Sequence, residues 1–564
     1  MGAETHSPFA NRLRQHLSCG GDDPAIIHYS PERAGEVDSA TWRQLDARVA
    51  NCAAGLQAAG LLPGQFVSII GPSGIDLIAC FLACLRLGAI ASIFPPPSPL
   101  QDHRYYLVQQ TKSLQTVNPD HVVVLGAAEG LGASLSEVLS SIHVIAFDPE
   151  QQHGGTVDDR SCEGGERVLF VQHSSGTTGI KKGVAISDRL LAVQLETYAE
   201  FLQLRSPAAS ISRPRIACWL PLYHDMGLVA CLLLSLYERG TLYLLDPFEW
   251  VAAPGSLLDV VDRYRVEYVW LPNFAFRFLS RCFPRGTVRD LSSVKLWINC
   301  SEPCRLETIE EFVARFGARG VSMSRIGCCY AMAETVFAVS QTPPGKEPCY
   351  LKVERTALQV GQPIVTCDSP TSMAVMSNGS LLPGVEVAVW SDRWEGDGVL
   401  GELCIRAPFL FEGYYRRPEL NASAFRDGFY LTGDIGFTCN GEVYVTGRSK
   451  EIIIIHGRNI FATDVEAVAN EVPGVKGGRC TAFGIESAAS GSEELIVVAE
   501  KDARSAETHA QIKRKLTEKI VNEFGIHPRD ILVVDERWLV KSTSGKISRS
   551  DNRQKYLNQA VAVG

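Results

Sequence analysis

The stretch VLFVQHSSGTTGIKKGV, residues 168–184, joins an apolar run to a polar segment with three glycines. Its first five residues, 168–172, form an apolar run that is typical of a buried strand. The strand leads directly into a segment where hydroxyls, glycines and lysines gather. Gly176 and Gly179 let the backbone turn with positive φ and approach a ligand closely, and Lys182 supplies a cation. The segment therefore predicts a loop that holds phosphate groups.

The loop does not follow the Walker A pattern of many nucleotide-binding proteins. That pattern needs glycine and then lysine five and six residues after its first glycine, whereas the residue five after Gly176 is Lys181. A flexible surface loop is the alternative interpretation. It explains the glycines, but it does not explain why hydroxyls and lysines gather directly after a strand.

Strand-like runs alternate with helical patterns on both sides of this loop. Residues 65–70, 121–125 and 267–270 are typical of strands, and residues 306–316 are typical of a helix. This alternation predicts an α/β fold, with layers built on a mostly parallel sheet.

The length of 564 residues predicts two or more domains. After residue 448 the chain passes through SKE at residues 449–451 into four isoleucines and then a mixed helix and strand pattern. We place the boundary there. A large N-terminal domain of layered α/β subdomains is expected over residues 1–449, and a small α+β domain over residues 450–564.

Composition and charge exclude several classes of protein. A net charge of -9 and a pI near 5.8 give no basic footprint for nucleic acid. Residues 1–17 lack the apolar core of a signal peptide, so we expect a cytoplasmic protein. The most apolar window, residues 77–94, contains Arg86 and is typical of a buried helix and then a strand, so no membrane span is expected. Seventeen cysteines without a CxxC pair indicate small buried residues in a reducing compartment.

The phosphate-loop segment resembles that of the adenylate-forming superfamily, which includes acyl-CoA synthetases, fatty acyl-AMP ligases, luciferases and nonribosomal peptide adenylation domains. The family often has proline near Lys181. Five further blocks resemble the family's motifs and follow in the family's order. They are residues 223–228 (YHDMGL), 330–335 (YAMAET), 430–434 (YLTGD), 447–448 (GR) and 544–546 (SGK). The resemblance covers nearly the whole chain.

The resemblance implies ATP and Mg²⁺ as cofactors. It implies catalytic roles for Lys546, Glu334 and Thr178, with Glu334 holding the metal. Cations are expected there because a carboxylate must approach a polyphosphate, and the repulsion must be offset where charge develops. The implied nucleotide-binding residues are Ser174, Ser175, Gly176, Thr177, Thr178, Gly179, Lys182, Ser301, Glu302, Pro303, Tyr330, Ala331, Met332, Asp434, Arg448 and Lys546. Among them the family's aromatic residue stacks on adenine, which implies Tyr330, and its aspartate binds both ribose hydroxyls, which implies Asp434.

Each of these residues also has a structural interpretation. Glu334 could be a carboxylate favoured by the dipole at a helix N-terminus. Asp434 and Arg448 could form a surface ion pair, and Lys546 could be a solvated loop lysine. Taken together with the phosphate loop, the functional interpretation is favoured.

The resemblance also implies an acyl site and a hinge. We expect His224, Asn273, Trp270 and Cys300 to border the carboxylic acid substrate, although a lone histidine is more often a hydrogen-bonded structural residue. Lys450 falls near the family's hinge. The small domain is therefore expected to act as a mobile lid that swings about Lys450.

Within the superfamily the chain looks most like the fatty acyl-AMP ligases, which pass the acyl group to an acyl carrier protein. The similar stretches are residues 219–228, 272–275 and 457–459, together with Ala333. Residues 341–382 also form a long segment where that branch carries an insertion, although an ordinary surface loop would fit as well.

The chain departs from this branch at three places. Bulky Trp270-Leu271 stands where small residues are usual, and residues 299–303 read NCSEP instead of NGAEP. Residues 331–334 read AMAE instead of GLAE. Because larger side chains fill space that glycine leaves open, we expect a reshaped acyl tunnel. The departures leave open a bulky, non-linear acid, and coenzyme A as the acceptor.

The expected activity is that of a two-domain adenylate-forming ligase. A carboxylate and ATP give acyl-AMP and pyrophosphate, and the phosphopantetheine thiol of an acyl carrier protein then displaces AMP. The alternatives are an acyl-CoA synthetase and a nucleotide-binding protein without turnover. The presence of Glu334, Asp434, Arg448 and Lys546 argues against the last of these.

Overall fold

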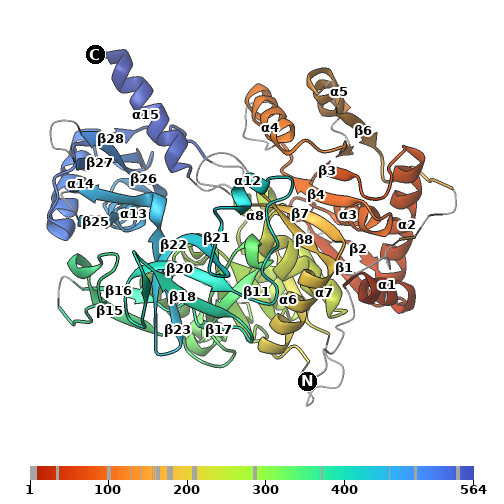
Figure 1. The fold of residues 1–564 in the computed structure, drawn as a ribbon, viewed down its shortest axis with the longest axis horizontal. Helices are drawn as coiled ribbons and strands as arrows, with labels where there is room; N and C mark the ends of the chain where they lie inside the picture. The colour runs from red at the N-terminus through yellow and green to blue at the C-terminus, as the bar shows by residue number, and fades with distance from the viewer. Residues whose placement is uncertain are drawn as a thin grey trace.

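In the computed structural model most of the chain forms layered sheets and helices (Figure 1). A smaller C-terminal part, in blue, lies beside the green and cyan strands of the middle of the chain. The residues that the structure describes are 9–33, 37–97, 103–126, 129–139, 142–154, 157, 159–160, 166–174, 182–205, 213–283, 289–369, 372–455, 458–487, 492–541 and 547–563.

One sheet lies in the first third of the chain and carries the strand before the phosphate loop. Its described strands, in spatial order, are β6 (His143–Phe147), β5 (His121–Leu125), β3 (Phe66–Ile70), β4 (Ile90–Phe94), β7 (Val168–Ser174) and β8 (Lys182–Ser187). All neighbours are parallel except β7 and β8, which form an antiparallel pair. The continuous apolar runs of β3 and β5 are buried along their whole length, as expected for parallel strands covered on both faces. The predicted strands at residues 65–70, 121–125 and 168–172 are confirmed.

A larger sheet of fifteen described strands runs through the middle of the molecule. Its path is β2 (Val37–Thr41), β1 (Pro24–Tyr29), β10 (Thr241–Leu245), β9 (Arg215–Cys218), β11 (Tyr268–Leu271), β12 (Leu296–Asn299), β13 (Ile326–Ala331), β14 (Ala338–Gln341), β17 (Ser380–Leu381), β23 (Glu442–Arg448), β22 (Phe429–Cys439), β20 (Gly401–Arg406), β18 (Glu386–Trp390) and β19 (Trp394–Glu395), with β21 (Phe425–Arg426) paired to β22. From β1 to β13 neighbouring strands are parallel, and from β13 to β19 they are antiparallel.

The antiparallel half corrects the expectation of a mostly parallel sheet. Parallel neighbours need a crossover, usually a helix, whereas antiparallel ones can be joined by tight turns. After β14 the strands follow one another through turns such as that between β22 and β23, where Asn440 and Gly441 both have positive φ. The segment at residues 341–382 is ordered in its described part, because β15 (Tyr350–Glu354) and β16 (Ser372–Met376) form an antiparallel pair.

Helices cover the sheets and share their cores. They are α1 (Phe9–Cys19), α2 (Trp42–Ala58), α3 (Ile75–Arg86), α4 (His103–Val117), α5 (Glu129–Val138), α6 (Asp188–Phe201), α7 (Leu234–Tyr237), α8 (Pro247–Ala252), α9 (Gly255–Tyr264), α10 (Asn273–Cys282), α11 (Leu306–Phe316) and α12 (Pro418–Asn421). The short turns are the π-helix η1 (Met226–Leu233) and the 3₁₀ turns η2 (Gly317–Arg319), η3 (Met323–Arg325), η4 (Ala333–Thr335), η5 (Arg355–Ala357) and η6 (Ser449–Glu451). The helix predicted at residues 306–316 is α11, and the apolar window at residues 77–94 is a buried helix and strand, as expected.

The C-terminal part has a hydrophobic core of its own, formed by residues between Ile453 and Ile531. The hairpin of β24 (Ile452–Ile455) and β25 (Arg458–Phe461) leads into it. The three-stranded sheet of β26 (Val475–Ser487), β27 (Ser492–Lys501) and β28 (Asp530–Val534) packs with α13 (Ala462–Asn470) and α14 (His509–Phe524), and α15 (Arg549–Val563) ends the chain. This mixed part and the layered sheets before it confirm the predicted fold class. The boundary at residue 449 stays a prediction.

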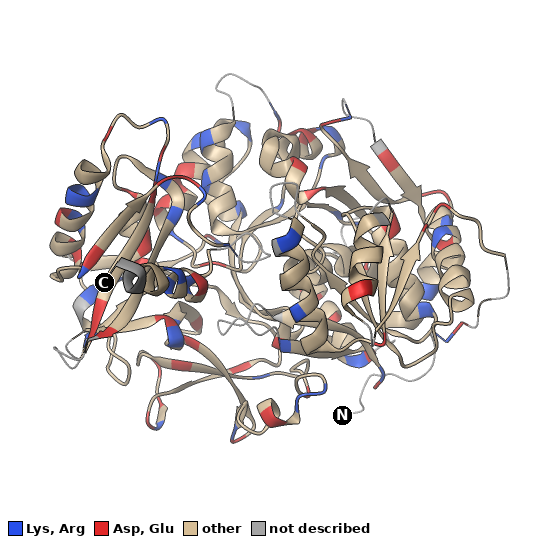
Figure 2. Ribbon diagram, turned by 90° about the horizontal axis from the view of Figure 1, so that it is seen from above, with Lys and Arg blue, Asp and Glu red and all other residues tan. Residues whose placement is uncertain are grey.

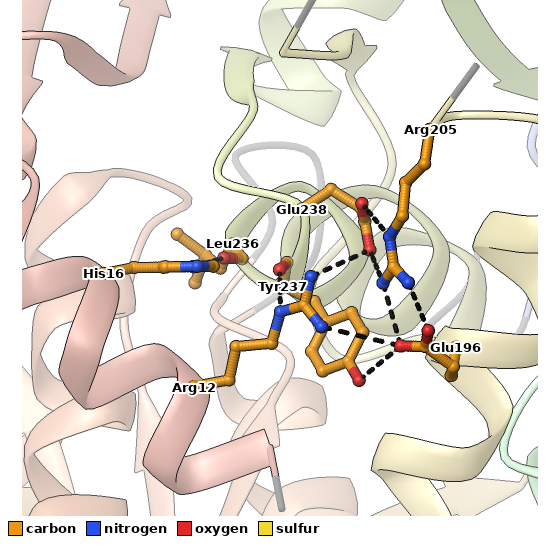
Figure 3. Close-up of polar contacts among 7 residues, drawn as sticks. All are labelled: Arg12, His16, Glu196, Arg205, Leu236, Tyr237 and Glu238. Atoms are coloured by element: carbon orange, nitrogen blue, oxygen red, sulfur yellow. Dashed lines mark hydrogen bonds and ion pairs between the residues drawn. The ribbon is translucent and has the colours of Figure 1, made fainter. Parts of the chain in front are cut away.

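The first helix is tied to the central layers by a network of charges (Figure 3). Arg205 donates to Glu196 and to Glu238, each at 2.8 Å. From α1, Arg12 lies 3.5 Å from a carboxylate oxygen of Glu196, and its guanidinium stacks over the ring of Tyr237 at 4.2 Å. The hydroxyl of Tyr237 also donates to Glu196, at 2.8 Å. The network therefore joins α1, α6 and α7 to one another.

Charges of both signs are distributed over all parts of the ribbon in Figure 2. None of the helices in the described ranges is long and apolar enough to cross a membrane. The described cysteines are free thiols and most are buried, which confirms their interpretation as small core residues.

Candidate active site

The phosphate-loop segment starts and ends on one antiparallel pair of strands. Ser174, the last residue of β7, lies opposite Lys182, the first residue of β8. Residues 175–181, between these two strands in the sequence, lie outside the described residues. They include the predicted site residues Ser175, Gly176, Thr177, Thr178 and Gly179.

The returning strand brings Lys182 toward a second chain segment. Lys182 Nζ lies 4.7 Å from the centre of the Tyr414 ring, and Val184 forms a β-bridge to Tyr414. The Tyr414 hydroxyl donates to Glu334 Oε1 at 3.1 Å. Burial lowers the pKa of Lys182, while Glu334 raises it and Lys450 lowers it further. Lys182 and Glu334, which belong to two different sequence motifs, thus both contact Tyr414.

Glu334 is buried inside the short turn η4 and does not begin a helix. Its backbone carbonyl accepts a hydrogen bond from Phe411 N at 2.8 Å. Burial raises the pKa of the carboxyl, and the hydroxyl of Tyr414 lowers it. Val336, two residues on, has a φ of +62°, which is rare for a β-branched residue. Such a strained turn is tolerated where the surrounding structure fixes it, as is common beside functional groups.

Asp434 is held between an aromatic hydroxyl and a guanidinium. Tyr330 donates its hydroxyl proton to Asp434 Oδ2 at 2.7 Å, and Arg448 Nε donates to Oδ1 at 3.1 Å. Asp434 and Arg448 are direct partners in the register of β22 and β23. Only 8% of the Asp434 side chain is exposed against 47% of that of Arg448, so the carboxylate is buried while the guanidinium reaches the surface. Burial raises the pKa of Asp434, and Arg448 lowers it.

Tyr330, Ala331 and Met332 follow one another at the end of β13, directly before η4. Tyr330 is buried, and Ala331 and Met332 are partly exposed. Because successive side chains of a strand point to opposite faces, Cys329 lies on the face opposite Tyr330. β13 therefore presents Tyr330 to Asp434 on one face and Cys329 to the core on the other.

The blocks around Asn273 and residues 299–303 are linked by hydrogen bonds. Asn299 Nδ2 donates to Asn273 Oδ1 at 3.0 Å, and Phe274 N donates to Glu302 Oε2 at 2.9 Å. Ser301 is exposed and has a φ of +69°. The left-handed conformation thus falls on Ser301 and not on Cys300. Pro303 is exposed beside them.

His224 lies directly before the π-helix η1. Gln172 Nε2, on β7, donates to the backbone carbonyl of Tyr223 at 2.9 Å, which links this segment to the strand of the phosphate loop. Asp225 Oδ1 accepts from Met226 N at 2.8 Å and begins η1. π-helical turns are rare and are frequent at functional sites. His224 is partly exposed, so it can border a ligand.

Trp270 and Cys300 are fully buried. The indole Nε1 of Trp270 donates to the hydroxyl of Tyr198 at 3.1 Å. Tyr198 and Tyr414 were not predicted from the sequence as site residues. Tyr414 lies 80 residues from Glu334, and no local pattern marks either tyrosine.

The predicted hinge and catalytic lysine lie between and beyond the two parts. Lys450 is exposed in η6, between the last strand of the large sheet and the C-terminal core. Lys546 lies outside the described residues, in a segment flanked by a β-bridge between Lys541 and Ile547. The C-terminal part contacts the large sheet's helices through Arg305, which lies 2.8 Å from Asp464 Oδ1.

Known proteins resemble this chain over most of its length. The family model described as AMP-binding enzyme matches residues 13–415. The medium-chain-fatty-acid–[acyl-carrier-protein] ligase JamA of Moorena producens is 27% identical over 93% of this chain and 90% of its own. The long-chain-fatty-acid–AMP ligase FadD32 of Mycolicibacterium smegmatis is 28% identical over 96% of this chain and 92% of its own.

The fold is shared with solved structures as well. A structure from work on fatty acyl-adenylate ligases of E. coli and L. pneumophila superposes with a TM-score of 0.87 at 22% identity, covering 98% of both chains. Since the family model matches more than half of the chain, the chain belongs to the AMP-binding enzyme family and is an adenylate-forming ligase.

Proposed function

We propose that this chain activates a fatty-acid-like carboxylic acid with ATP, giving acyl-AMP and pyrophosphate, and then transfers the acyl group to a phosphopantetheine thiol of an acyl carrier protein. The observation that carries the proposal is the buried Asp434, fixed between Tyr330 and Arg448. A carboxylate offers about four lone-pair positions, and these contacts use two of them. The remaining positions suit two adjacent ribose hydroxyls.

The other nucleotide contacts follow from the same arrangement. Arg448 binds Asp434 through Nε, so its remaining N–H groups can bridge ribose and phosphate. Lys182 and residues 174–179 hold the departing phosphates, with Thr178 as a hydroxyl donor. Lys546 offsets the charge that develops as the carboxylate meets the α-phosphate. Ser301, Glu302, Pro303, Ala331 and Met332 border the base and ribose, and Tyr330 supplies an aromatic face.

Glu334 fits a magnesium site of the kind that phosphate-transfer enzymes use. No group of three or more histidine, cysteine or acidic side chains gathers in the described ranges, so a cage made by the protein alone is not present there. Mg²⁺ commonly binds through one or two carboxylates, waters and substrate phosphates, which a single buried carboxylate beside Lys182 suits. When bound, the ion would neutralise phosphate charge. Glu334 would hold it, and Tyr414 would orient Glu334.

The acyl end is assigned to His224, Asn273, Trp270 and Cys300. Buried Trp270 and Cys300 restrict its depth, so the acid is more compact than a long straight chain. The acceptor is taken as a carrier protein because the relative JamA bears the name of an acyl-carrier-protein ligase. Coenzyme A is the alternative acceptor. The residues 450–564 act as the lid domain, with Lys450 as the hinge.

Mass spectrometry of the products tests the proposal. The protein is supplied with ATP, Mg²⁺ and a panel of acids, without thiol, with coenzyme A, or with a phosphopantetheinylated carrier protein. Acyl-AMP that converts to thioester only on the carrier protein is expected. Acyl-CoA would favour the alternative acceptor, and the absence of any acyl-AMP would reject the function. A Lys546→Ala variant is expected to lose adenylate formation, and its undiminished activity would remove Lys546 from catalysis.

A further inference from the structure

A chain of buried polar side chains begins at Trp270, one of the residues assigned to the acyl end. Trp270 Nε1 donates to the hydroxyl of Tyr198 at 3.1 Å, and that hydroxyl donates to Gln341 Oε1 at 2.5 Å. Tyr198 is 1% exposed, and Trp270 and Gln341 are fully buried. The three residues come from α6, β11 and β14. These hydrogen bonds join residues that are far apart in the sequence. They therefore fix how the three elements pack against one another in the hydrophobic core.

The chain of hydrogen bonds ends in polar atoms that have no partner. Gln341 Nε2 is buried and makes no hydrogen bond to any of the residues that the structure describes. If the Gln341 amide were flipped, Oε1 would take the position of Nε2. One polar atom of this side chain therefore lacks a hydrogen bond in either orientation. Both polar atoms of Gln194 are likewise buried without a partner within the described ranges. Gln194 lies one helical turn before Tyr198, so the two side chains share one side of α6.

These groups lie next to the proposed acyl end. Gln341 is the direct partner of Cys329 in the register of β13 and β14. Burial raises the pKa of the Tyr198 hydroxyl, and the thiols of Cys329 and Cys300 raise it further. Cys300 is followed by Ser301, which borders the nucleotide in the proposed function. The polar groups therefore adjoin Trp270 and Cys329, beside the proposed acyl end.

The surroundings make unmet polar atoms costly. The ring of Phe337 packs on that of Tyr198, with 5.5 Å between their centres. The ring of Trp270 also contacts that of Tyr198, with 6.3 Å between their centres. A buried amide without a partner loses its hydration and gains nothing in return. A ligand oxygen placed here could form hydrogen bonds with these amide groups, whereas an alkyl chain could not.

We propose that Tyr198, Gln341 and Gln194 form a polar subsite that selects acids carrying a hydroxyl or oxo oxygen away from the carboxylate. The inference rests on the proposed function and names its substrate class. The amide N–H groups of Gln341 and Gln194 can donate to either kind of oxygen, and the Gln194 carbonyl can accept from a hydroxyl. The contacts of these three residues in the described structure include no charged side chain, so a second carboxylate or an ammonium group is not expected.

Matched pairs of acids test the subsite. Pyrophosphate release is measured for decanoic acid against decanoic acids with a hydroxyl or oxo group at successive carbons, and for phenylalkanoic acids against their hydroxyphenyl counterparts. For at least one position, kcat/KM of the oxygenated acid is expected to exceed that of its plain partner by about 10-fold or more. The hydroxyl and oxo series distinguish the two kinds of oxygen.

Variants connect the preference to the named residues. Tyr198→Phe, Gln341→Met and Gln194→Leu are each expected to bring the ratio of kcat/KM between the paired acids toward one. Tyr268→Phe is the matched control. It removes a hydroxyl from the same strand as Trp270, two residues away, and it is expected to keep the ratio of the wild type. Binding of sulfamoyl-adenosine analogues of the paired acids gives the same ratio without turnover, and melting curves identify any variant that does not fold.

Three results would overturn the inference. The wild type could activate plain acids at least as well as every oxygenated partner, or Tyr198→Phe and Gln341→Met could both keep the wild-type ratio while folded. In both cases acyl-AMP still forms, so the proposed function stands and only the subsite falls. If no acid gives acyl-AMP, the proposed function falls and the subsite falls with it.

Discussion

At the scale of single residues, the side chains of the site depend on neighbours that fix them. Asp434 faces inward because β22 and β23 pair it with Arg448, and Tyr330 reaches it from β13. A carboxylate in this position is buried, paired with a guanidinium and still able to accept further hydrogen bonds. Its function therefore depends on its charge and not only on its shape.

Replacing Asp434 with asparagine tests this dependence. Hydrogen bonds to a charged group contribute about 1.5–3 kcal/mol, so kcat/KM for ATP is expected to fall about 10- to 100-fold in Asp434→Asn. The rate is measured as pyrophosphate release at varied ATP. Asp392→Asn, at an exposed position of the same sheet, serves as the control and is expected to match the wild type. Equal kcat/KM in Asp434→Asn and wild type would exclude Asp434 from nucleotide binding.

Ser301 gives a second prediction at this scale, because its φ of +69° suits few side chains. A β-branched residue there costs about 1–2 kcal/mol, so Ser301→Val is expected to lower the free energy of unfolding by about that amount. Ser301→Gly is expected not to lower it, since glycine adopts this conformation freely. Denaturant titration measures both. Ser322→Val, at an exposed serine with a φ of -129°, is the control, and a loss there as large as in Ser301→Val would contradict the explanation.

At the scale of elements, α1 illustrates how one helix joins a distant core. Its residues reach α6 and α7 through the network around Arg205, whose two carboxylate partners come from different helices. Burial raises the pKa of Glu196, but hydrogen bonds from Arg205 and Tyr237 outweigh this and lower that pKa to about 2. A depressed carboxyl pKa means that the ionised form stabilises the fold.

The network therefore predicts a pH dependence. The contribution of Glu196 is complete above its unfolded pKa of about 4.5 and is lost as the pH falls toward the folded value. With solvent screening it amounts to about 1–2 kcal/mol, so Glu196→Gln is expected to lower the melting temperature by about 1–3 °C at pH 7 and by less at pH 3.5. Scanning fluorimetry measures both. Glu200→Gln, exposed on the same helix, is the control, and a deficit in Glu196→Gln that is as large at pH 3.5 as at pH 7 would contradict the assignment.

At the scale of the whole molecule, polar contacts join the two parts, and one of them centres on Arg305. Arg305, at the start of α11, binds Asp464 of α13 at 2.8 Å, and its backbone N–H donates to Asn273 at 3.2 Å. Only 7% of the Asp464 side chain is exposed. Arg305 therefore contacts both Asn273 and the C-terminal part.

Loss of this contact should loosen the junction. In Arg305→Gln, hydrogen exchange of peptides that cover residues 449–451 and 462–466 is expected to be about fivefold faster, as for the loss of about 1 kcal/mol at a partly exposed ion pair. Arg315→Gln is the control, because Arg315 lies on the same helix and donates to Phe283 O. Unchanged exchange in Arg305→Gln would mean that the pair does not hold the two parts together.

The sequence predicted the elements whose signal is local. Apolar runs marked β3, β5 and β7, and periodicity marked α11. The antiparallel half of the large sheet was missed, because the direction in which strands pair is set by tertiary structure and not by local sequence. The candidate site motifs are local patterns in the sequence, and their roles stay predictions. Tyr414, Tyr198 and Gln341 were not predicted, since their contacts join residues 80 and 143 positions apart.

The alternation of β13 has a consequence for how such a protein can change over time. Tyr330 donates to Asp434, and Cys329 is the register partner of Gln341, so in the functions proposed above one strand would serve nucleotide and acid with adjacent residues. Inserting or deleting a single residue in residues 326–331 would exchange the two faces and disable both at once. New acid preferences are therefore expected to arise here by substitutions at fixed length, while changes of length collect in the turns.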